Sequence, residues 1–395
     1  MIISLLWDAD YPWDVRVEKV VGSLLRDGHQ VHLICRNLQR RAEYEYINGL
    51  HVHRLPRFPR QLTALHAVLS FPAFFNPLWL HALWKVSRRN RAELMMVRDL
   101  PMCPAGLWVA RLLRIPCLMD MAECYPEMLR CTWAFEGVKA KNILVRNPRL
   151  ADMVEKYCLR RLDMIMVMIE ESAARLRRKG VPAARLAIVS NTPRLALAEQ
   201  YLQARRESRQ FDIVYIGLLN PSRGLDTVLE GAALLVKNGF AFRLTIAGTG
   251  KDQKRLQGMV KKLKLASHVI MPGWIVHEKV DELFSRATVG LVPHHVCAHW
   301  DHTIPNKLFD YMAAGIPVLS TNVRPMERII RETECGLVYA DWHPESFADA
   351  VMRLNDEGLR RRLGANGCQA VRARYHWETE EKVLLRIVQS TVQKK

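Results

Sequence analysis

The stretch that decides the fold reads Thr303-Ile-Pro-Asn-Lys-Leu-Phe-Asp-Tyr-Met-Ala-Ala-Gly-Ile-Pro317 and continues into Val-Leu-Ser320. Its pattern predicts a short helix that includes Lys307–Ala313, with Pro305 at the first helical position and Thr303 before it as a cap. A strand, Pro317–Ser320, follows at once. A helix that leads directly into an apolar strand is the repeating unit of a parallel sheet with helical crossovers.

The same alternation extends on both sides of this stretch. Short apolar runs predict strands at Asp212–Leu218, Arg243–Ala247, His268–Met271, Val289–Val292 and Gly336–Tyr339. Amphipathic stretches between them predict helices at Leu225–Lys237, Asp252–Leu263, Lys279–Arg286 and Met326–Arg331. From Glu345 to Gln393 the period is almost entirely helical, and Trp377 begins a final helix.

The first half of the chain has a second set of such elements. The predicted strands are Ile2–Leu6, Gln30–Cys35, Leu94–Val97, Cys117–Met121, Met164–Ile169 and Leu186–Val189. The predicted helices are Val15–Arg26, Pro104–Leu113, Arg149–Arg161 and Glu171–Lys179. A chain of 395 residues is longer than a single hydrophobic core usually accommodates. We therefore expect an α/β fold of two Rossmann-like domains. Such domains bind ligands beyond the carboxyl ends of their strands, so we expect the site in a cleft where those ends face each other.

The charge balance is strongly basic, with 58 Lys and Arg against 40 Asp and Glu. No acidic residue occurs from Tyr46 to Ala92. This part of the chain instead carries Arg54, Arg57, Arg60, Lys85, Arg88, Arg89 and Arg91. Such a surface favours an anionic partner: nucleic acid, a phosphorylated substrate or anionic lipid.

An uncharged run, Gln61 to Trp84, lies between the two basic clusters. Pro72 and Pro77 argue against a continuous membrane-spanning helix. Two interpretations stay open: two short core helices broken at Phe71–Pro77, or a helix pair that lies in a membrane interface with its arginines on lipid headgroups.

Two features indicate the cytosol. The apolar segment Met1 to Trp7 has no basic region before it and is cut short by Asp8 and Asp10, which is unlike a signal peptide. Nine cysteines occur without a CxxC pair, as expected of reduced, mostly buried thiols.

The residues with the clearest chemical meaning are Lys307 and Asp310. Lys307 lies in the first helical turn, where a cation is unfavourable unless an anion binds there. Asp310 lies three residues on along the same face, so the two could instead form a simple ion pair. We favour a site in which the helix N-terminus and Lys307 hold phosphates while Asp310 holds ribose hydroxyls. Arg223 follows the turn Asn220-Pro221 at another helix start, where positive charge beside free helix amides suits a phosphate. Taken alone it would be interpreted as a solvated surface arginine, but together with the Lys307 helix we expect it to be a further phosphate ligand.

Glycine-rich nucleotide motifs are weak in this chain. The first predicted strand is followed by WDADYPWDVRVEK, which has no GxGxxG and argues against NAD or FAD in the first domain. Gly248-Thr249-Gly250 follows a strand, and as a bare GxG it indicates a tight strand-to-helix turn.

Several phrases of the sequence resemble the retaining glycosyltransferases of the family 4, or group 1, type. In the second half these are YIGLLNPSRGLDTVLEG at 215–231, PGW at 272–274, PNKLFDYMAAGIPVLS at 305–320 with Glu327 after it, and YHWE at 375–378. In the first half the likeness is looser: GHQVHLI at 28–34, VRDLP at 97–101, DMAECYPEM at 120–128 and VSNTP at 189–193.

The resemblance implies a GT-B architecture with four parts. These are an acceptor-binding domain at 1–194, a linker at 195–210, a nucleotide-sugar-binding domain at 211–374, and a C-terminal helix at 375–395 that packs back toward the first domain. No cofactor beyond the nucleotide diphosphosugar donor is expected.

The family's functional residues carry over with departures. Its cationic phosphate pair falls on Leu218 and Arg223; leucine cannot replace the family's arginine, and Lys307 is expected to supply the missing charge. Its two spaced glutamates fall on His302 and Asp310. The family's first-domain histidine falls on Ala122, which leaves Glu123 as the nearest polar group to the expected reaction centre.

The resulting site has two sets of residues. The expected catalytic residues are Arg223, Lys307 and Glu123. The expected donor-binding residues are Gly217, Arg223, Gly248, Trp274, His302, Thr303, Ile304, Pro305, Asn306, Lys307 and Asp310. A minority alternative makes a metal site of His294, His295, Cys297, His299, Asp301 and His302, but these lie on a loop without regular ligand spacing, so no metal is expected.

The expected function is transfer of a sugar from a nucleotide diphosphosugar to an acceptor hydroxyl, with retention of configuration. The acceptor is expected to be a glycan or lipid-linked glycan of a bacterial surface polysaccharide, and the protein is expected to be cytoplasmic and peripheral to the inner face of the cell membrane. Two alternatives remain: a nucleotide-sugar epimerase of the same architecture and a non-enzymatic basic RNA-binding protein. The latter lacks the interleaved aromatic platforms of single-strand readers, so no nucleic acid partner is expected.

Overall fold

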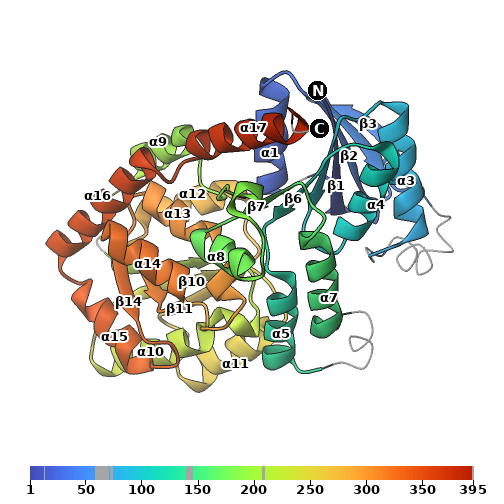
Figure 1. Ribbon diagram of the computed structural model, residues 1–395. Coiled ribbons are helices and arrows are strands. Elements are labelled where there is room, and N and C mark those ends of the chain that lie inside the picture. The colour runs from blue at the N-terminus through green and yellow to red at the C-terminus, as the bar shows by residue number, and fades with distance from the viewer. Residues whose placement is uncertain (13, 58–70, 72–73, 139–145, 207–209, 394–395) are drawn as a thin grey trace. The chain divides into compact units, whose positions relative to one another are not determined.

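A computed structural model describes the whole chain apart from residues 13, 58–70, 72–73, 139–145, 207–209 and 394–395 (Figure 1). It divides into two compact units. Unit 1 comprises Met1–Arg130, Val138–Asn191 and Glu380–Lys395, and unit 2 comprises Cys131–Gly137 and Thr192–Thr379. Each unit contains one sheet of mainly parallel strands with helical crossovers, which confirms the predicted α/β class with two Rossmann-like domains.

The sheet of unit 1 has the strand order β3-β4-β2-β1-β5-β6-β7-β8. Its strands are β1 (Ile2–Asp10), β2 (Gln30–Arg36), β3 (Tyr44–Ile47), β4 (Leu50–Arg54), β5 (Leu94–Arg98), β6 (Cys117–Met121), β7 (Met164–Val167) and β8 (Leu186–Ile188). Its helices include α1 (Val15–Arg26), α3 (Pro77–Arg89), α4 (Cys103–Leu113), α7 (Pro148–Leu159) and α8 (Glu170–Arg178). The six predicted strands and four predicted helices of this half are confirmed. Most ends shift by at most two residues, and β1 continues four residues beyond its predicted end at Leu6.

The sequence did not predict the β3–β4 hairpin, which extends the sheet at its β2 edge. β3 is antiparallel to β4, and β4 is parallel to β2. Burial alternates along Leu50–Arg54, with Leu50, Val52 and Arg54 buried and the two histidines between them partly exposed. Such a strand buries too little apolar surface to appear as an apolar run. Helix α5 (Tyr125–Glu136) was also not predicted.

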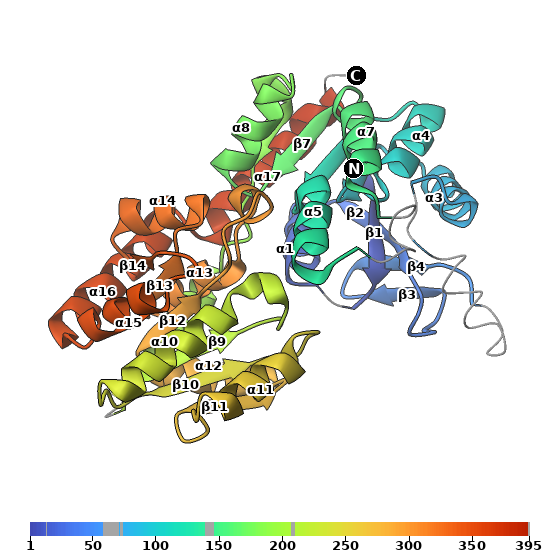
Figure 2. The ribbon, with the colours of Figure 1, turned by 90° about the horizontal axis from the view of Figure 1, so that it is seen from below.

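The sheet of unit 2 has the strand order β11-β10-β9-β12-β13-β14, and every pair in it is parallel. The strands are β9 (Asp212–Ile216), β10 (Arg243–Ala247), β11 (Val269–Gly273), β12 (Val289–Val292), β13 (Val318–Thr321) and β14 (Gly336–Tyr339). The helices are α9 (Leu195–Ala204), α10 (Leu225–Lys237), α11 (Gln253–Lys262), α12 (His277–Arg286), α13 (Asn306–Ala313), α14 (Arg324–Thr333), α15 (Pro344–Arg353), α16 (Glu357–Ala373) and α17 (Trp377–Gln393), the last of which continues into unit 1. Apart from α9, which is labelled in Figure 1, these elements can be followed by label in Figure 2.

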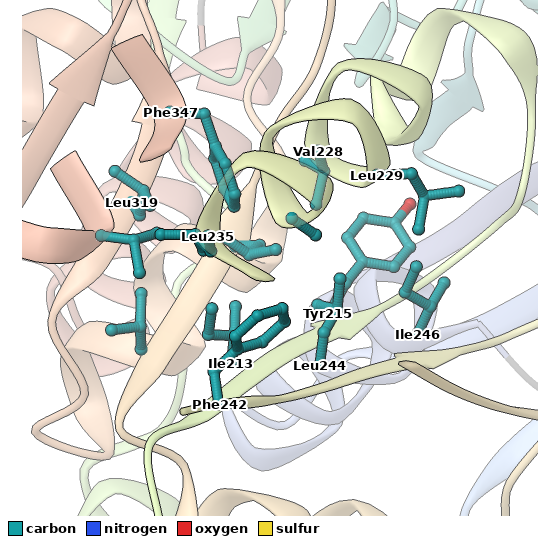
Figure 3. Packing of buried hydrophobic residues seen from close by; sticks show 14 of the residues in the cluster. Ile213, Tyr215, Val228, Leu229, Leu235, Phe242, Leu244, Ile246, Leu319 and Phe347 are labelled. Carbon is teal, nitrogen blue, oxygen red and sulfur yellow. The ribbon is translucent and has the colours of Figure 1, made fainter. Parts of the chain in front are cut away.

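The core of unit 2 is built by side chains that alternate along β9. Ile213 and Tyr215 face α10, where Val228, Leu229 and Leu235 point toward them (Figure 3). On the opposite face the Tyr311 hydroxyl of α13 donates to the Val214 carbonyl at 3.1 Å. A sheet covered on both faces requires near-continuous apolar strands, which is the pattern that allowed them to be predicted.

The expected domain limits differ in detail from this division. Residues 195–204, expected in the linker, form α9, which packs on α12 and α13 within unit 2. The C-terminal segment belongs to unit 1 from Glu380 onward, where Glu380 accepts a hydrogen bond from the Ser190 amide at 2.9 Å.

The uncharged run at 61–84 falls largely outside the described residues. Its described end is α3, where Trp79 and Leu83 are fully buried against β1, β2 and α4, so this part is a core helix. Arg54 was expected on the basic surface, and this was wrong: its side chain is buried, pairs with Glu45 and donates to the Tyr11 carbonyl. No helix in the described part of the chain is long and apolar enough to cross a bilayer.

Candidate active site

The residues expected to bind the donor gather at the carboxyl edge of the unit 2 sheet. Gly217 follows β9, Gly248 follows β10, and the loop from Pro293 to Pro305 follows β12. The chain order reverses between β9 and β12, because β10 and β11 lie on one side of β9 and the later strands lie on the other. In doubly wound sheets this switch point is where ligands bind.

Glycines let the loops after β9 and β10 approach each other. A Cβ atom on Gly248 would lie 1.8 Å from the Gly217 carbonyl oxygen, and the backbone at Gly248 has φ +142. A Cβ on Gly217 would lie 3.0 Å from the Lys307 Cε atom. The structure therefore brings Gly217, Gly248 and Lys307 together, and the GxG at 248–250 is a close-packed turn as predicted.

Lys307 lies at the second position of α13 and is largely enclosed. Burial lowers its pKa, the neighbouring Asp310 raises it, and the positive charge of Arg223 lowers it again. A lysine amine in the first turn of a helix, beside a second cation, is a place where an anion is favourable.

The start of α13 differs from the prediction. The helix begins at Asn306, and Pro305 is its N-cap rather than its first residue. No side chain accepts a capping hydrogen bond there, so Thr303 does not cap the helix; Thr303 is buried, as is Ile304. Because proline has no side-chain acceptor and Thr303 lies two residues before it, a side-chain cap is absent.

Arg223 lies at the end of a short 3-10 turn, Pro221–Arg223, just before Gly224 and α10. Its guanidinium lies over the Trp300 ring at 4.5 Å from the centroid and donates to His294 Nε2. No carboxylate lies within ion-pair distance of Arg223 in the described part of the chain, and its Nε atom is buried without a hydrogen-bond partner. A cation held by an aromatic ring and a neutral imidazole remains available to an external anion.

Histidines from the loop after β12 support Arg223. His294 is fully enclosed, and burial together with the charges of Arg223 and Lys307 holds its pKa well below the ordinary value. Burial and Arg223 also lower the pKa of His299 to about 3. Both rings are therefore neutral and pack against Trp300. Among the described residues no group of three or more His, Cys, Asp or Glu is arranged to hold a metal ion.

His295 has the opposite electrostatic environment. Its Nδ1 lies 2.7 Å from Asp341 and its Nε2 lies 3.1 Å from Asp226, the second residue of α10. Its ring stacks on Trp342 at 3.6 Å between centroids. Although burial opposes the charged form, the two carboxylates raise the pKa of His295 to about 9. The His295 amide also donates to the Ser222 carbonyl, so this residue fastens the loop that carries Arg223.

The remaining donor-side residues are less enclosed. His302 Nδ1 lies 2.6 Å from the Ala298 carbonyl at the surface. Trp274 follows the edge strand β11 and is 76% exposed, and Leu218, which stands where the family has an arginine, is 56% exposed. Asn306 is partly buried at the first position of α13.

Glu123, the expected catalytic residue of the first half, lies in unit 1 just after β6, where its amide donates to Asp99 at 3.2 Å. Around it the structure assembles an ionic cluster that the sequence did not reveal. The Arg16 guanidinium donates to both oxygens of Asp120, at 2.6 to 3.0 Å. Arg98 lies 3.4 Å from Asp14 and 3.8 Å from Asp120.

Carboxylates in this cluster are perturbed. Burial raises the pKa of Asp99 to about 6, although Arg98 opposes the shift, and burial also raises the pKa of Asp8. The cluster surrounds the carboxyl ends of β1, β5 and β6, and the chain order of unit 1 reverses between β1 and β5. Its members come from the phrases WDADYPWDVRVEK at 7–19, VRDLP at 97–101 and DMAE at 120–123, so charged residues at the ends of strands and just after them were the available signal.

Comparison with known proteins agrees with this geometry. The family model described as "Glycosyl transferases group 1" matches residues 199–370, and the model described as "Glycosyl transferase 4-like domain" matches residues 14–192. The chain belongs to the group 1 glycosyltransferases. The resemblance drawn from the sequence is thereby confirmed.

Individual relatives of this glycosyltransferase chain are distant. The alpha-D-kanosaminyltransferase of Streptomyces kanamyceticus is 23% identical over 240 residues, which covers 57% of this chain and 60% of the relative. The alignments cover 39–60% of the first curated relatives, so the chain spans about half of their length.

Solved structures match over the whole chain. Sucrose-phosphate synthase from Thermosynechococcus elongatus has a TM-score of 0.78 at 20% identity, with 100% of both chains covered. Anabaena Alr3699/HepE in complex with UDP and glucose has a TM-score of 0.69 at 13% identity, with 99% of this chain and 100% of that chain covered. At these identities the likeness concerns the fold, which is that of GT-B glycosyltransferases.

Proposed function

We propose that this protein transfers a sugar from a nucleotide diphosphosugar to an acceptor hydroxyl, with retention of configuration. The observation that carries the proposal is the pair of cations at the switch point of unit 2. The positive charge of Arg223 lowers the pKa of Lys307, and Asp310 only partly offsets the burial of Lys307. A diphosphate bound there would neutralise both cations beside the first-turn amides of α13.

The reaction requires charge to move onto the leaving diphosphate. As the bond between sugar and diphosphate breaks, negative charge grows on the diphosphate oxygens, and fixed cations stabilise that charge more than the ground state. Arg223 and Lys307 have this role in the proposal. Removal of one such contact typically raises the barrier by roughly 3 kcal/mol.

The other site residues bind and orient the donor. Asp310 presents a carboxylate three residues from Lys307 on the same helix and would accept hydrogen bonds from the ribose hydroxyls. Gly217 and Gly248 have no side chains, so a nucleotide could approach the backbone of the loops after β9 and β10. In the proposal, Glu123 of unit 1 contacts the acceptor, and His302 of unit 2 lies beside the donor sugar.

An acceptor anchored in a membrane is supported by an exposed face on α4 and α7, which pack together in unit 1. Trp108 and Leu112 are 57% and 64% exposed on α4, and Met153 is 69% exposed on α7. Exposed basic residues on or beside these helices are Arg111, Arg114, Arg149, Lys156 and Arg160. Aromatic and aliphatic side chains beside arginines suit the headgroup region of an anionic bilayer, as for synthesis of a lipid-linked surface glycan on the cytoplasmic side.

A donor screen tests the proposal. Thermal unfolding of the full chain is measured with UDP-, GDP- and ADP-sugars, because a bound donor stabilises the folded state by mass action. One nucleotide class should raise the unfolding temperature, and that donor should then be consumed when candidate acceptors are added. A donor converted without any acceptor would favour an epimerase instead. No shift with any nucleotide sugar would refute the proposal.

A further inference from the structure

A second basic cavity lies in unit 2, at the opposite edge of the sheet from the donor site. It has a volume of about 380 Å³, and its described lining includes five arginines, Arg205, Arg206, Arg286, Arg360 and Arg361, while Glu357 is the one acidic residue among the described lining residues. We call it the arginine cavity. Thr288 and Pro317, which precede β12 and β13, also line it, and these residues place it at the amino ends of the strands.

Helix α13 separates the arginine cavity from the donor site. Lys307 lies in the first turn of this helix, whereas Gly315, two residues beyond its end, lines the arginine cavity. Eight helical residues span about 12 Å, so one ligand of ordinary size does not fill both places.

Two of the arginines are held by backbone carbonyls rather than carboxylates. Arg205 donates to the carbonyls of Phe284 and Ala287 at 2.8 Å each, at the end of α12. Arg360 donates to Leu354 and Asn355 at 2.6 Å each, after the end of α15. These contacts fix the guanidinium groups at helix C-termini, whose partial negative charge stabilises a cation but does not supply a full countercharge.

Carboxylates neutralise only part of the arginine cavity. Glu357 lies 2.5 Å from Arg361, and Glu282 lies 3.5 Å from Arg286. In the part of the chain that the structure describes, no carboxylate lies within ion-pair distance of Arg205, Arg206 or Arg360. Burial lowers the pKa of Arg205, and the Cys368 sulfur only partly offsets this. Positive charges this close together repel each other unless an anion lies between them.

We propose that the arginine cavity binds a small molecule that carries two or more phosphate groups, at a site separate from the donor site. Its volume falls within the roughly 300–1,000 Å³ of small-molecule sites and is too small for a folded partner. Guanidinium groups recognise phosphate oxygens with paired, directed hydrogen bonds, and arginines contributed by the ends of α9 and α12 and by α16 suit more than one phosphate group.

Calorimetric titration with inorganic pyrophosphate tests this site. The titration uses the full-length chain carrying Arg223→Ala and Lys307→Ala, which removes the cations of the donor site, at fixed ionic strength. We expect saturable binding of one pyrophosphate per chain and weaker binding of orthophosphate. Adding Arg206→Gln and Arg361→Gln should weaken the binding roughly tenfold or more. Arg205 and Arg360 are left intact because they hold helix ends.

A matched control separates a built site from general basicity. Arg353→Gln with Arg362→Gln removes the same charge from exposed positions on α15 and α16 outside the arginine cavity, and should leave the affinity unchanged. Circular dichroism checks that each variant is folded. Equal weakening by both pairs, no saturable binding, or orthophosphate that binds as tightly as pyrophosphate would overturn the proposal. Because the donor-site cations are already absent, this outcome is independent of the proposed transferase activity.

Discussion

His295 should carry a positive charge at neutral pH, although its side chain is fully enclosed. It lies 2.7 Å from Asp341 and 3.1 Å from Asp226, and these carboxylates raise its pKa to about 9, from an ordinary value of 6.5. At 1.36 kcal/mol per pKa unit, this shift corresponds to about 3 kcal/mol of folding free energy.

The direction of the pH dependence follows from the sign of the shift. The folded state binds the proton more tightly than the unfolded state, so the stabilisation is fully present below pH 6.5. It decreases as the pH rises and is lost once the pH passes about 9. His295→Gln removes the charge and should therefore make stability less dependent on pH across this range.

Two measurements check this prediction. Nuclear magnetic resonance of ring-labelled histidines, with His295 assigned by its loss in His295→Gln, should give a midpoint near 9. Chemical unfolding at pH 6 and pH 9.5 should show the wild type losing about 3 kcal/mol more than His295→Gln. His343→Gln, at an exposed histidine before α15, is the matched control and should behave as the wild type. A His295 midpoint at or below 6.5 would show that the two carboxylates do not stabilise a charged imidazole.

Three further predictions concern the donor site and the exposed face. Asp310→Asn should weaken nucleotide binding, measured by calorimetry, roughly tenfold, because charge-assisted hydrogen bonds to the ribose are lost. Asp349→Asn, at an exposed position of α15, should leave the affinity unchanged, and equal affinities of the two variants would show that Asp310 does not bind the nucleotide. Gly248→Ala should destabilise the protein by about 3 kcal/mol, because at φ +142 the new Cβ atom would overlap the Gly217 carbonyl oxygen. Gly258→Ala, at a helical glycine with open space around it, should not destabilise the protein, and unchanged thermal unfolding of Gly248→Ala would contradict the close approach of the two loops. Trp108→Ser with Met153→Ser should reduce cosedimentation with anionic vesicles without a change in thermal unfolding, and undiminished cosedimentation would count against this face as the membrane contact.

The sequence predicted those features that depend on residues close together in the chain. The strands of unit 2 were visible because helices cover both faces of the sheet, which makes each strand an apolar run, as at Val289–Val292. Val15–Arg26 was predicted at its observed limits because its apolar positions recur with helical spacing. Lys307 and Asp310 were found for the same reason, since three residues of one helix determine their relation.

Features that depend on the order of strands were missed. Arg16 and Asp120 are 104 residues apart, and only the pairing of β1, β5 and β6 brings them together. The clamp on His295 likewise joins residues from α10, the loop after β12 and the turn after β14. A run of histidines in that loop suggested metal ligands, but the fold gives neighbouring rings different roles: His294 supports Arg223, and His295 pairs with carboxylates.

In the proposed reaction, Arg223 and Lys307 hold the diphosphate of a nucleotide sugar at the carboxyl edge of the unit 2 sheet. Calorimetry with UDP, GDP and ADP on the wild type, on Lys307→Ala and on the matched control Lys261→Ala, an exposed lysine of α11, tests this role most directly. One nucleoside diphosphate should bind the wild type and the control alike, with a loss of roughly tenfold or more in Lys307→Ala. Equal affinity in Lys307→Ala, or no binding of any nucleoside diphosphate to the wild type, would contradict this role of the two cations.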